Sequence, residues 1–337
     1  MLKTGDRYQL WELLTAIRKA DSILLFAHVS PDGDTIGSML ALYRLLVRLH
    51  KPVRMVLDGE IPVNLCFLPH VHEIRKPGDI AAGTDRNARC SVAIAVDVGS
   101  AGRMGAGERL FHCADITAQI DHHETNTGYA HINVIDGMAP ATAVLVSRIY
   151  AELGMGLQTE DAICLYTALS TDTGNFVYKN TNAEAFVLMG RLMDSGLPLE
   201  EYSRFLFRQK EKGFVAVLGK ALTTLSFLLD GKIAGMHMSF AQIVEAGGRD
   251  GDTDGIIDYA IDIVGVKMAY FIREIKGGTV RVNLRSIAPY RVDEIAAAFG
   301  GGGHQAAAGC TLNSTLADAL ERVQAALRNA YERIQHQ

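Results

Sequence analysis

The sequence predicts an α/β protein: an N-terminal, doubly wound and mostly parallel sheet, joined by a helical linker to a smaller α+β domain. Three observations support this fold class. In the N-terminal half, short continuous apolar runs alternate with segments of helical periodicity, which is the pattern of βαβ units. A charged stretch over residues 196–214 interrupts that alternation, and the later apolar runs come in pairs around turn dipeptides. We therefore expect one domain over residues 1–195 and a second over 215–337.

In the first domain, apolar runs predict strands and periodic segments predict helices. The run 23–27 is apolar throughout, which suits a strand buried on both faces of a parallel sheet. Leu10, Leu13 and Ile17 recur with helical spacing, which predicts an amphipathic helix. We expect strands at 22–29, 53–57, 91–98 and 115–121, and helices at 8–20, 35–50, 141–153, 159–171 and 182–195.

In the second domain, paired apolar runs predict hairpins. The runs 222–229 and 232–240 flank Asp230-Gly231, a dipeptide that strongly favours a hairpin. A second pair turns at Gly277-Gly278. We further expect strands at 264–275 and 279–286, a short helix at 292–299, a glycine-rich loop, a strand of small residues, and a closing amphipathic helix at 315–334.

Composition narrows the class of protein. Hydrophobic residues make up 48% and charged residues 21% of the chain, a balance that argues against disorder. The net charge of -5 argues against a generally basic nucleic-acid scaffold but allows a short nucleotide ligand. The five cysteines form no CxxC pair, and no apolar run approaches the length of about 20 residues that a membrane span needs. We expect a soluble cytoplasmic protein without membrane contact, and a homodimer stays open.

Polar residues gather where the predicted strands of the first domain end, which is where open α/β sheets place their chemistry. Taken singly, each has an ordinary explanation. Asp34 could cap the helix that follows, Asp97 could pair with Arg103, and Asp172 could end a helix. The residues that would meet at this edge are His28, Asp32, Asp34, Asp97, Asp121, His122, His123 and Asp172.

Together these residues predict a metal site. Several carboxylates at one sheet edge would repel each other, and two divalent cations would relieve that repulsion. Mixed carboxylate and imidazole ligands suit Mn²⁺, with Mg²⁺ or Co²⁺ as substitutes, whereas the lack of cysteine ligands disfavours Zn²⁺. A two-metal site is suited to in-line displacement at phosphorus.

The second domain offers a candidate phosphate or base site. In a strand, Arg281, Asn283 and Arg285 would share one face, and two guanidinium groups beside an amide suit phosphate recognition. Successive amides of Gly300–Gly303 could form an anion-binding nest. A solvated sheet face and a flexible loop are the competing interpretations.

In their order along the chain, these segments resemble the DHH phosphoesterases and their associated C-terminal domain, and the resemblance covers nearly the whole chain. The first part rests on Asp121-His122-His123 and the acids around it. The matching segments are His28-x-x-x-Asp32-x-Asp34, Asp97, Asp121-His122-His123, Thr171-Asp172-Thr173-Gly174, the strand Arg281–Ser286 and the loop Gly301–His304.

The resemblance implies roles for these residues. One Mn²⁺ would be held by His28, Asp32 and Asp97, and the other by Asp34, Asp97, His122 and Asp172, with Asp97 bridging. A metal-bridging hydroxide would attack phosphorus. His123, Asp97 and Asp121 would be the catalytic residues, with His123 facing the phosphate and Asp121 orienting a ligand. The active site would lie in the interdomain cleft, and the substrate would be bound by Arg103, Arg281, Asn283, Arg285, Ser286, Gly301, Gly302, Gly303 and His304.

The resemblance also implies an activity. The closest branch of the family hydrolyses short single-stranded oligoribonucleotides (nanoRNA) to mononucleotides and removes the 3′-phosphate of pAp. A phosphodiesterase for cyclic or linear dinucleotides, such as c-di-AMP or pApA, is the nearest enzymatic alternative. A nucleotide-binding regulator on the same fold is the non-enzymatic one.

Overall fold

The computed structural model describes residues 4–83 and 90–335. The chain divides into two compact units, Met1–Gln209 and Lys210–Gln337. Helix α8 (Leu199–Ser203) and a π-helical turn (Arg204–Arg208) end the first unit, and α9 (Lys212–Leu222) begins the second. The charged stretch 196–214 is therefore divided between the two units.

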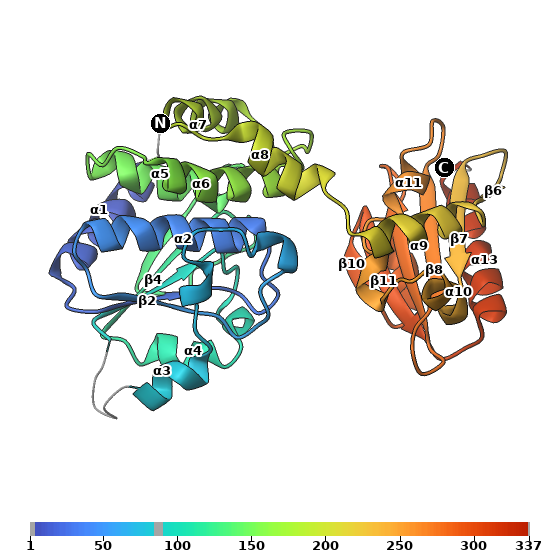
Figure 1. Ribbon diagram of the computed structural model, residues 1–337, viewed down its shortest axis with the longest axis horizontal. Coiled ribbons are helices and arrows are strands. Elements are labelled where there is room, and N and C mark those ends of the chain that lie inside the picture. The colour runs from blue at the N-terminus through green and yellow to red at the C-terminus, as the bar shows by residue number, and fades with distance from the viewer. Residues whose placement is uncertain (1–3, 84–89, 336–337) are drawn as a thin grey trace. The chain divides into compact units, whose positions relative to one another are not determined.

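The first unit is built on a five-stranded sheet in which every neighbouring pair is parallel, as predicted (Figure 1). The strand order is β2-β1-β3-β4-β5, and β1 lies between β2 and β3 with Ile23 opposite both Val53 and Val92. The order places the ends of β1, β3 and β4 side by side. The strands are β1 (Ile23–Phe26), β2 (Val53–Val56), β3 (Val92–Val96), β4 (Ile116–Asp121) and β5 (Ile132–Ile135).

Strand β5 was not predicted. It is only four residues long, and half-buried Asn133 interrupts its apolar pattern. Pairing with β4 at the sheet edge, with Gln119 opposite Asn133, accounts for the strand where local sequence does not.

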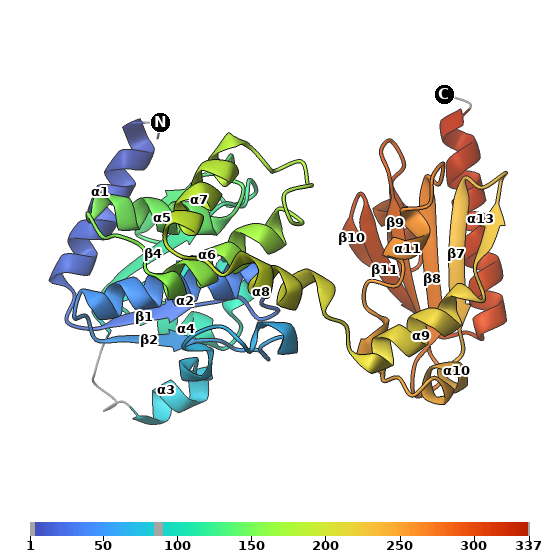
Figure 2. The same cartoon turned by 45° about the horizontal axis from the view of Figure 1, so that its top comes forward.

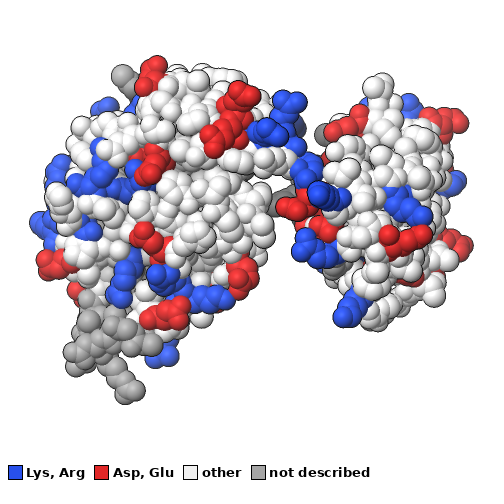
Figure 3. Space-filling view, in the orientation of Figure 1, with Lys and Arg blue, Asp and Glu red and all other residues white. Residues whose placement is uncertain are grey.

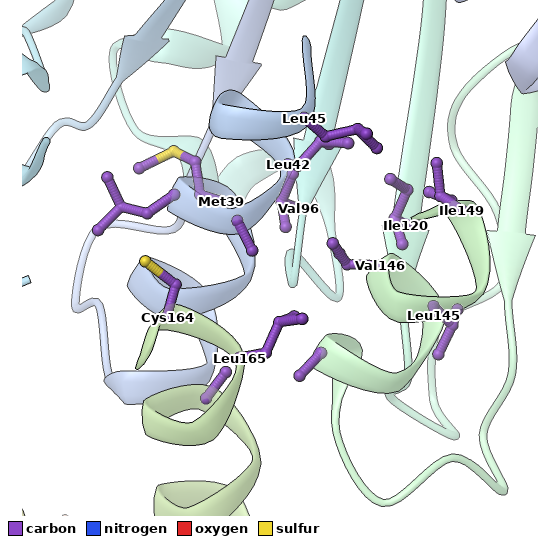
Figure 4. Packing of buried hydrophobic residues seen from close by; sticks show 14 of the residues in the cluster. Met39, Leu42, Leu45, Val96, Ile120, Leu145, Val146, Ile149, Cys164 and Leu165 are labelled. Carbon is purple, nitrogen blue, oxygen red and sulfur yellow. The ribbon is translucent and has the colours of Figure 1, made fainter. Parts of the chain in front are cut away.

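Helices cover both faces of this sheet, as in a doubly wound fold (Figure 1). Ile23 and Leu25 point into the larger core, under α1, α2, α5 and α6, whereas Leu24 and Phe26 point into the smaller core, under α3 and α4. Figure 4 shows side chains of α2, α5 and α6 packed together with Val96 and Ile120. The helices are α1 (Thr4–Lys19), α2 (Gly33–Arg48), α3 (Pro77–Gly83), α4 (Gly107–His112), α5 (Thr142–Glu152), α6 (Thr159–Asp172) and α7 (Ala183–Asp194).

The second unit contains a six-stranded mixed sheet in the order β10-β11-β9-β8-β7-β6, in which only β7 and β8 run parallel among the described strands. Both predicted hairpins are present. The first turns at Leu229, Asp230 and Gly231, which all have positive φ angles. The strands are β6 (Ser226–Leu228), β7 (Ile233–Met238), β8 (Met268–Glu274), β9 (Val280–Ser286), β10 (Gly302–His304) and β11 (Ala307–Leu312).

Two predictions for this unit need correction. The run from Leu222 is not a strand at its start, because α9 continues to that residue and β6 begins only at Ser226. The segment Gly301–His304 is not simply a loop, since β10 pairs with β11 in antiparallel register. Ladder hydrogen bonds hold these glycines extended, although their sequence suggests flexibility.

Helices also cover both faces of the second sheet (Figure 2). Val282 and Leu284 of β9 pack under α12 and α13, and the opposite face is covered along β7 and β8 by α9, α10 and α11. Among the described residues, we find no helix with both the length and the apolar character that a membrane crossing requires. The remaining helices are α10 (Phe240–Glu245), α11 (Asp258–Ile261), α12 (Val292–Ala298) and α13 (Leu316–Gln335).

Candidate metal centre

The polar segments of the first unit converge at one edge of the parallel sheet. Within the described residues, three groups each bring one candidate ligand atom per residue to within 4.8 Å of the others. All six predicted metal ligands belong to these groups, and Asp97 belongs to two of them. The groups are His28, Asp32 and Asp97; Asp34, His122 and Asp172; and Asp97, His122 and His123.

Asp97 lies at the centre of the site. It directly follows β3, its side chain is buried, and its backbone has a φ of 60°, which is uncommon for a residue other than glycine. Its Oδ2 lies 3.9 Å from His28 Nε2, and its Oδ1 lies 3.8 Å from His122 Nε2. The two carboxylate oxygens therefore face different ligand groups.

Asp32, and not Asp34, caps helix α2. The Asp32 carboxylate accepts a hydrogen bond of 3.0 Å from the backbone amide of Thr35, which corrects the cap that Asp34 alone would suggest. Asp34 lies inside the first turn and accepts from the amides of Thr142 and Ala143 at 2.7 and 3.1 Å. These amides form the N-terminus of α5, where backbone dipoles favour a negative charge.

Burial and mutual repulsion disfavour the charged forms of these acids. Burial, followed by the nearby charge of Asp97, raises the pKa of Asp34 well above its usual range. Burial, followed by the charge of Asp32, raises the pKa of Asp97 to about 8. Burial also raises the pKa of Asp172, while His122 opposes that shift. Without cations, the site is electrostatically unfavourable.

His28 is buried and held neutral. Burial, assisted by the positive charge of Arg103, lowers its pKa to about 4, and the neutral imidazole is the form that binds metals. Arg103 Nη2 lies 3.3 Å from His28 Nδ1. The alternative pairing of Arg103 with Asp97 is not found among the described residues.

His122 and His123 are adjacent but face different partners. His122 Nδ1 lies 3.2 Å from the carbonyl oxygen of Ala139, to which it can donate, and this leaves Nε2 toward the acids. That Nε2 lies 3.7 Å from Asp34 and 3.5 Å from Asp172. His122 is therefore oriented as a ligand.

His123 instead pairs with Asp121. Its Nδ1 lies 2.7 Å from Asp121 Oδ1, and hydrogen bonding to this carboxylate is the main reason that the pKa of His123 rises to about 8. Asp121 is fully buried and also accepts from the side-chain amide of Asn126. The pair gives the site a partly exposed imidazole that carries a positive charge near neutral pH.

Gly33 allows the two ligand-bearing helices to approach. A Cβ atom at this position would lie 2.6 Å from Cγ2 and 2.8 Å from Cβ of Thr171 on α6. Glycine is needed here for space and not for backbone freedom, because the φ angle of Gly33 lies outside the left-handed region. The close approach places Asp32 and Asp34 opposite Asp172, the last residue of α6.

The donor set fits divalent cations. Buried carboxylates that repel one another, combined with imidazoles that are neutral or aimed at the acids, are the ligands expected for Mn²⁺ or a similar ion. Sequence reasoning missed the neutral side chains that hydrogen-bond to these candidate ligands and to Asp121, since hydroxyl and amide groups carry no distinctive signal. They are Thr35, Thr142, Asn126 and Asn180.

In the second unit, β9 presents the predicted face. Arg281, Asn283 and Arg285 alternate with buried Val282 and Leu284, and Arg285 Nε lies 3.4 Å from Asp258 Oδ1. Glycines 301–303 and His304 are exposed. Ser286 lies on the opposite, buried face, where its hydroxyl donates to the carbonyls of Tyr290 and Gln305 at 2.8 and 3.2 Å. The exposed face therefore does not include the Ser286 hydroxyl.

The parallel sheet with its edge of acids and imidazoles, followed by a mixed-sheet unit, defines a class of two-domain α/β proteins. The chain belongs to the DHH family: the profile for the DHH family N-terminal domain matches residues 22–169, and that for the DHHA1 domain matches residues 235–333. It is 33% identical over 325 residues to the bifunctional oligoribonuclease and PAP phosphatase NrnA of Thermus thermophilus, covering 96% of this chain and 93% of the relative.

Solved structures agree with this fold. An exopolyphosphatase-related protein from Bacteroides fragilis superimposes with a TM-score of 0.89 and 24% identity, over 98% of each chain. RecJ from Thermus thermophilus, in complex with Mn²⁺, superimposes with a TM-score of 0.55 and 17% identity, over 97% of this chain and 55% of that one.

Proposed function

We propose that this chain is a metal-dependent phosphoesterase that hydrolyses short oligoribonucleotides to mononucleotides and removes the 3′-phosphate of pAp. The observation that carries the proposal is the meeting of two candidate ligand groups at Asp97. The NrnA relative, which spans nearly the same length, supports the choice of substrates. The free cysteines support a reducing cytoplasm as its location.

The proposed centre holds two cations. His28, Asp32 and Asp97 would bind one ion, and Asp34, Asp97, His122 and Asp172 would bind the other. Mn²⁺ is the proposed ion, with Mg²⁺ or Co²⁺ as substitutes. When bound, such ions neutralise charge on the phosphoryl oxygens and lower the pKa of the attacking water.

The protein's own residues would orient the phosphate and stabilise charge. His123, charged through its bond to Asp121, would donate to a phosphoryl oxygen as negative charge develops in the transition state. Arg103, beside His28, would bind a second phosphoryl oxygen. Together, the positively charged side chains of His123 and Arg103 would fix the reacting phosphate beside the acidic ligands.

The second unit would bind the rest of the substrate. We assign this role to the exposed face of β9 and to the glycine strand β10, which β11 separates from β9. Guanidinium groups and accessible amides there suit a phosphate or a base edge. The residues are Arg281, Asn283, Arg285, Gly301, Gly302, Gly303 and His304.

Surface charge supports a short substrate. On the face of the first unit that Figure 3 shows, basic and acidic side chains are interspersed, and the chain carries a net charge of -5. A protein that tracks a long nucleic acid usually presents a basic stripe.

A turnover assay tests the proposal. Purified protein with MnCl₂ is given end-labelled RNA of about two to five nucleotides, and separately pAp, pApA, c-di-AMP and pyrophosphate, in the size range that a short-substrate site accepts. We expect hydrolysis of RNA and pAp, loss of both activities in Asp97→Asn and His122→Ala, and retention in Asp194→Asn, which changes an acid of α7 outside the centre. Faster turnover of pApA or c-di-AMP would favour the dinucleotide phosphodiesterase, and tight binding without turnover would favour a regulator.

A further inference from the structure

Each carboxylate oxygen of Asp97 accepts a hydrogen bond from a different buried threonine. Thr35 Oγ1 lies 2.6 Å from Asp97 Oδ2, and Thr142 Oγ1 lies 3.0 Å from Oδ1. Both threonines are fully buried. Thr35 belongs to α2 and lies 62 residues before Asp97, and Thr142 belongs to α5 and lies 45 residues after it. Two separate helices therefore hold one side chain.

The two threonines use their backbone amides in the same way. The amide of Thr35 donates to Asp32 at 3.0 Å, and the amide of Thr142 donates to Asp34 at 2.7 Å. Each threonine thus joins Asp97 to a carboxylate of one ligand group: Thr35 to the group with His28, and Thr142 to the group with His122.

Ordinary helix capping does not account for the hydroxyl bonds. In a cap, a side-chain oxygen accepts a hydrogen bond from a backbone amide near the helix start, as the Asp32 carboxylate does for α2. The Thr35 hydroxyl has one proton and lies 2.6 Å from both Asp97 Oδ2 and His28 Nε2, and 3.1 Å from Asp32 Oδ1. Because Arg103 faces the other ring nitrogen of His28, Nε2 can donate to this hydroxyl, which then donates its own proton to Asp97, the closer of the two carboxylates. The hydroxyl of Thr142 likewise points away from its own helix, to Asp97.

The geometry sets the direction of each oxygen. A carboxylate oxygen has two lone pairs, so one bond from a threonine leaves one lone pair for another partner. Oδ2 is the oxygen near His28, and Oδ1 is the oxygen near His122. Because the backbone at Asp97 is also constrained by its positive φ, the carboxylate is fixed at both ends.

We propose that Thr35 and Thr142 are positioning residues that direct one oxygen of Asp97 toward each of two cations. This inference rests on the proposed metal centre and assigns the threonines no contact with substrate. Side chains that orient metal ligands commonly change metal affinity by about 10- to 100-fold when removed. The affected quantity is therefore cation binding.

The test uses the full-length protein, stripped of metal and titrated with MnCl₂ while free Mn²⁺ is followed by its electron paramagnetic resonance signal. We expect Thr35→Val and Thr142→Val, which keep side-chain volume but lose the donor, to weaken Mn²⁺ binding by about 10- to 100-fold. Thr35→Ser and Thr142→Ser keep the hydroxyl, and we expect their affinities to stay close to that of the unaltered protein.

Thr167→Val is the matched control. Thr167 is a fully buried threonine of α6 whose hydroxyl has no hydrogen-bond partner among the described residues, so the same substitution removes no bond. We expect it to leave Mn²⁺ affinity unchanged. Circular dichroism confirms folding of every variant. If one valine variant does not fold, the valine and serine variants at the other position still test the proposal, because each threonine has its own bond to Asp97.

The outcomes separate this inference from the proposed function. Unchanged Mn²⁺ affinity in both folded valine variants would overturn the positioning role and leave the metal centre intact. An equal loss in the serine variants or in Thr167→Val would overturn it too, because the effect would then come from packing. If the unaltered protein binds no Mn²⁺, both the inference and the proposed function fail.

Discussion

Nδ1 of His123 lies 2.7 Å from Oδ1 of Asp121, and this carboxylate is completely buried. The bond aims the imidazole by fixing one ring nitrogen, and it leaves Nε2 as the nitrogen that can meet a substrate. Neighbouring His122 points its own Nε2 at three carboxylates. One dipeptide thus combines a candidate metal ligand, His122, with a candidate hydrogen-bond donor to the phosphate, His123.

His123→Gln should separate these two roles. We expect kcat to fall by about 10²- to 10³-fold, as when a single donor to a developing oxyanion is removed. Mn²⁺ stoichiometry, measured by equilibrium dialysis and elemental analysis, should stay at the value of the unaltered protein. Loss of one bound ion would contradict this, and would make His123 a ligand together with Asp97 and His122, a grouping that the distances also permit.

Metal removal should destabilise the protein. In the stripped protein, burial and mutual repulsion disfavour the charged forms of Asp34 and Asp97. Mn²⁺ binding should stabilise the folded protein by about 2.7 kcal/mol per ion at a free concentration 100 times Kd. For a unit of this size that corresponds to a rise in Tm of roughly 5–10 °C per ion.

Differential scanning calorimetry with increasing MnCl₂ measures this rise. Asp97→Asn removes the carboxylate proposed to be shared by the two ions, so its Tm should respond little to Mn²⁺. Asp194→Asn lies outside the centre and should keep the full response. If the Tm of the unaltered protein does not change as MnCl₂ is added, that result would argue against the metal centre.

The sequence predicted well which strands carry the residues of the candidate site. His28 and Asp97 follow apolar runs and Asp121 ends an alternating run, patterns that favour strands of a parallel sheet. Parallel strands bring such ends to one edge. These candidate ligands are conspicuous because an acid or imidazole buried at the end of an apolar strand is costly without a partner.

The sequence could not predict features that depend on tertiary contact. Asp34 looks like a helix cap, because the amides of Thr142 and Ala143 that bind it are 108 and 109 residues away. Strand β5 depends on pairing with β4, and Ser286 turns inward because Tyr290 and Gln305 offer carbonyls there. In each case the decisive partner is distant or carries no charge.

Gly33→Ala should weaken the metal centre through packing alone. The added methyl group would overlap Thr171, whose hydroxyl is held by the carbonyl of Thr167 at 2.8 Å and cannot easily move. Overpacking of this kind costs about 1–3 kcal/mol, and the displaced turn carries Asp32 and Asp34. We expect a lower free energy of unfolding in urea and weaker Mn²⁺ binding.

Two variants check the cause of that loss. Thr171→Ala in the Gly33→Ala background removes Oγ1 and Cγ2, the two closest atoms, but keeps Cβ, so it should recover part of both quantities. Gly190→Ala, at an exposed position of α7 with no atom within 4 Å of the new Cβ, should be neutral or stabilising by about 1 kcal/mol. Equal destabilisation by both glycine substitutions would rule out the contact with Thr171 as the cause.

Arg285→Ala tests the second unit. If Arg285 binds a substrate phosphate, its loss removes a charge-assisted hydrogen bond worth about 1.5–3 kcal/mol, which raises KM by roughly 10- to 100-fold. The rate at saturation should change less, since groups of the first unit are the ones proposed to hold the reacting phosphate. Steady-state kinetics with pAp and a dinucleotide measure both parameters.

Arg291→Ala is the control, because exposed Arg291 is already paired with Asp293 and Glu294 in the same unit. A KM that stays constant in Arg285→Ala, or that rises equally in Arg291→Ala, would remove Arg285 from the substrate site.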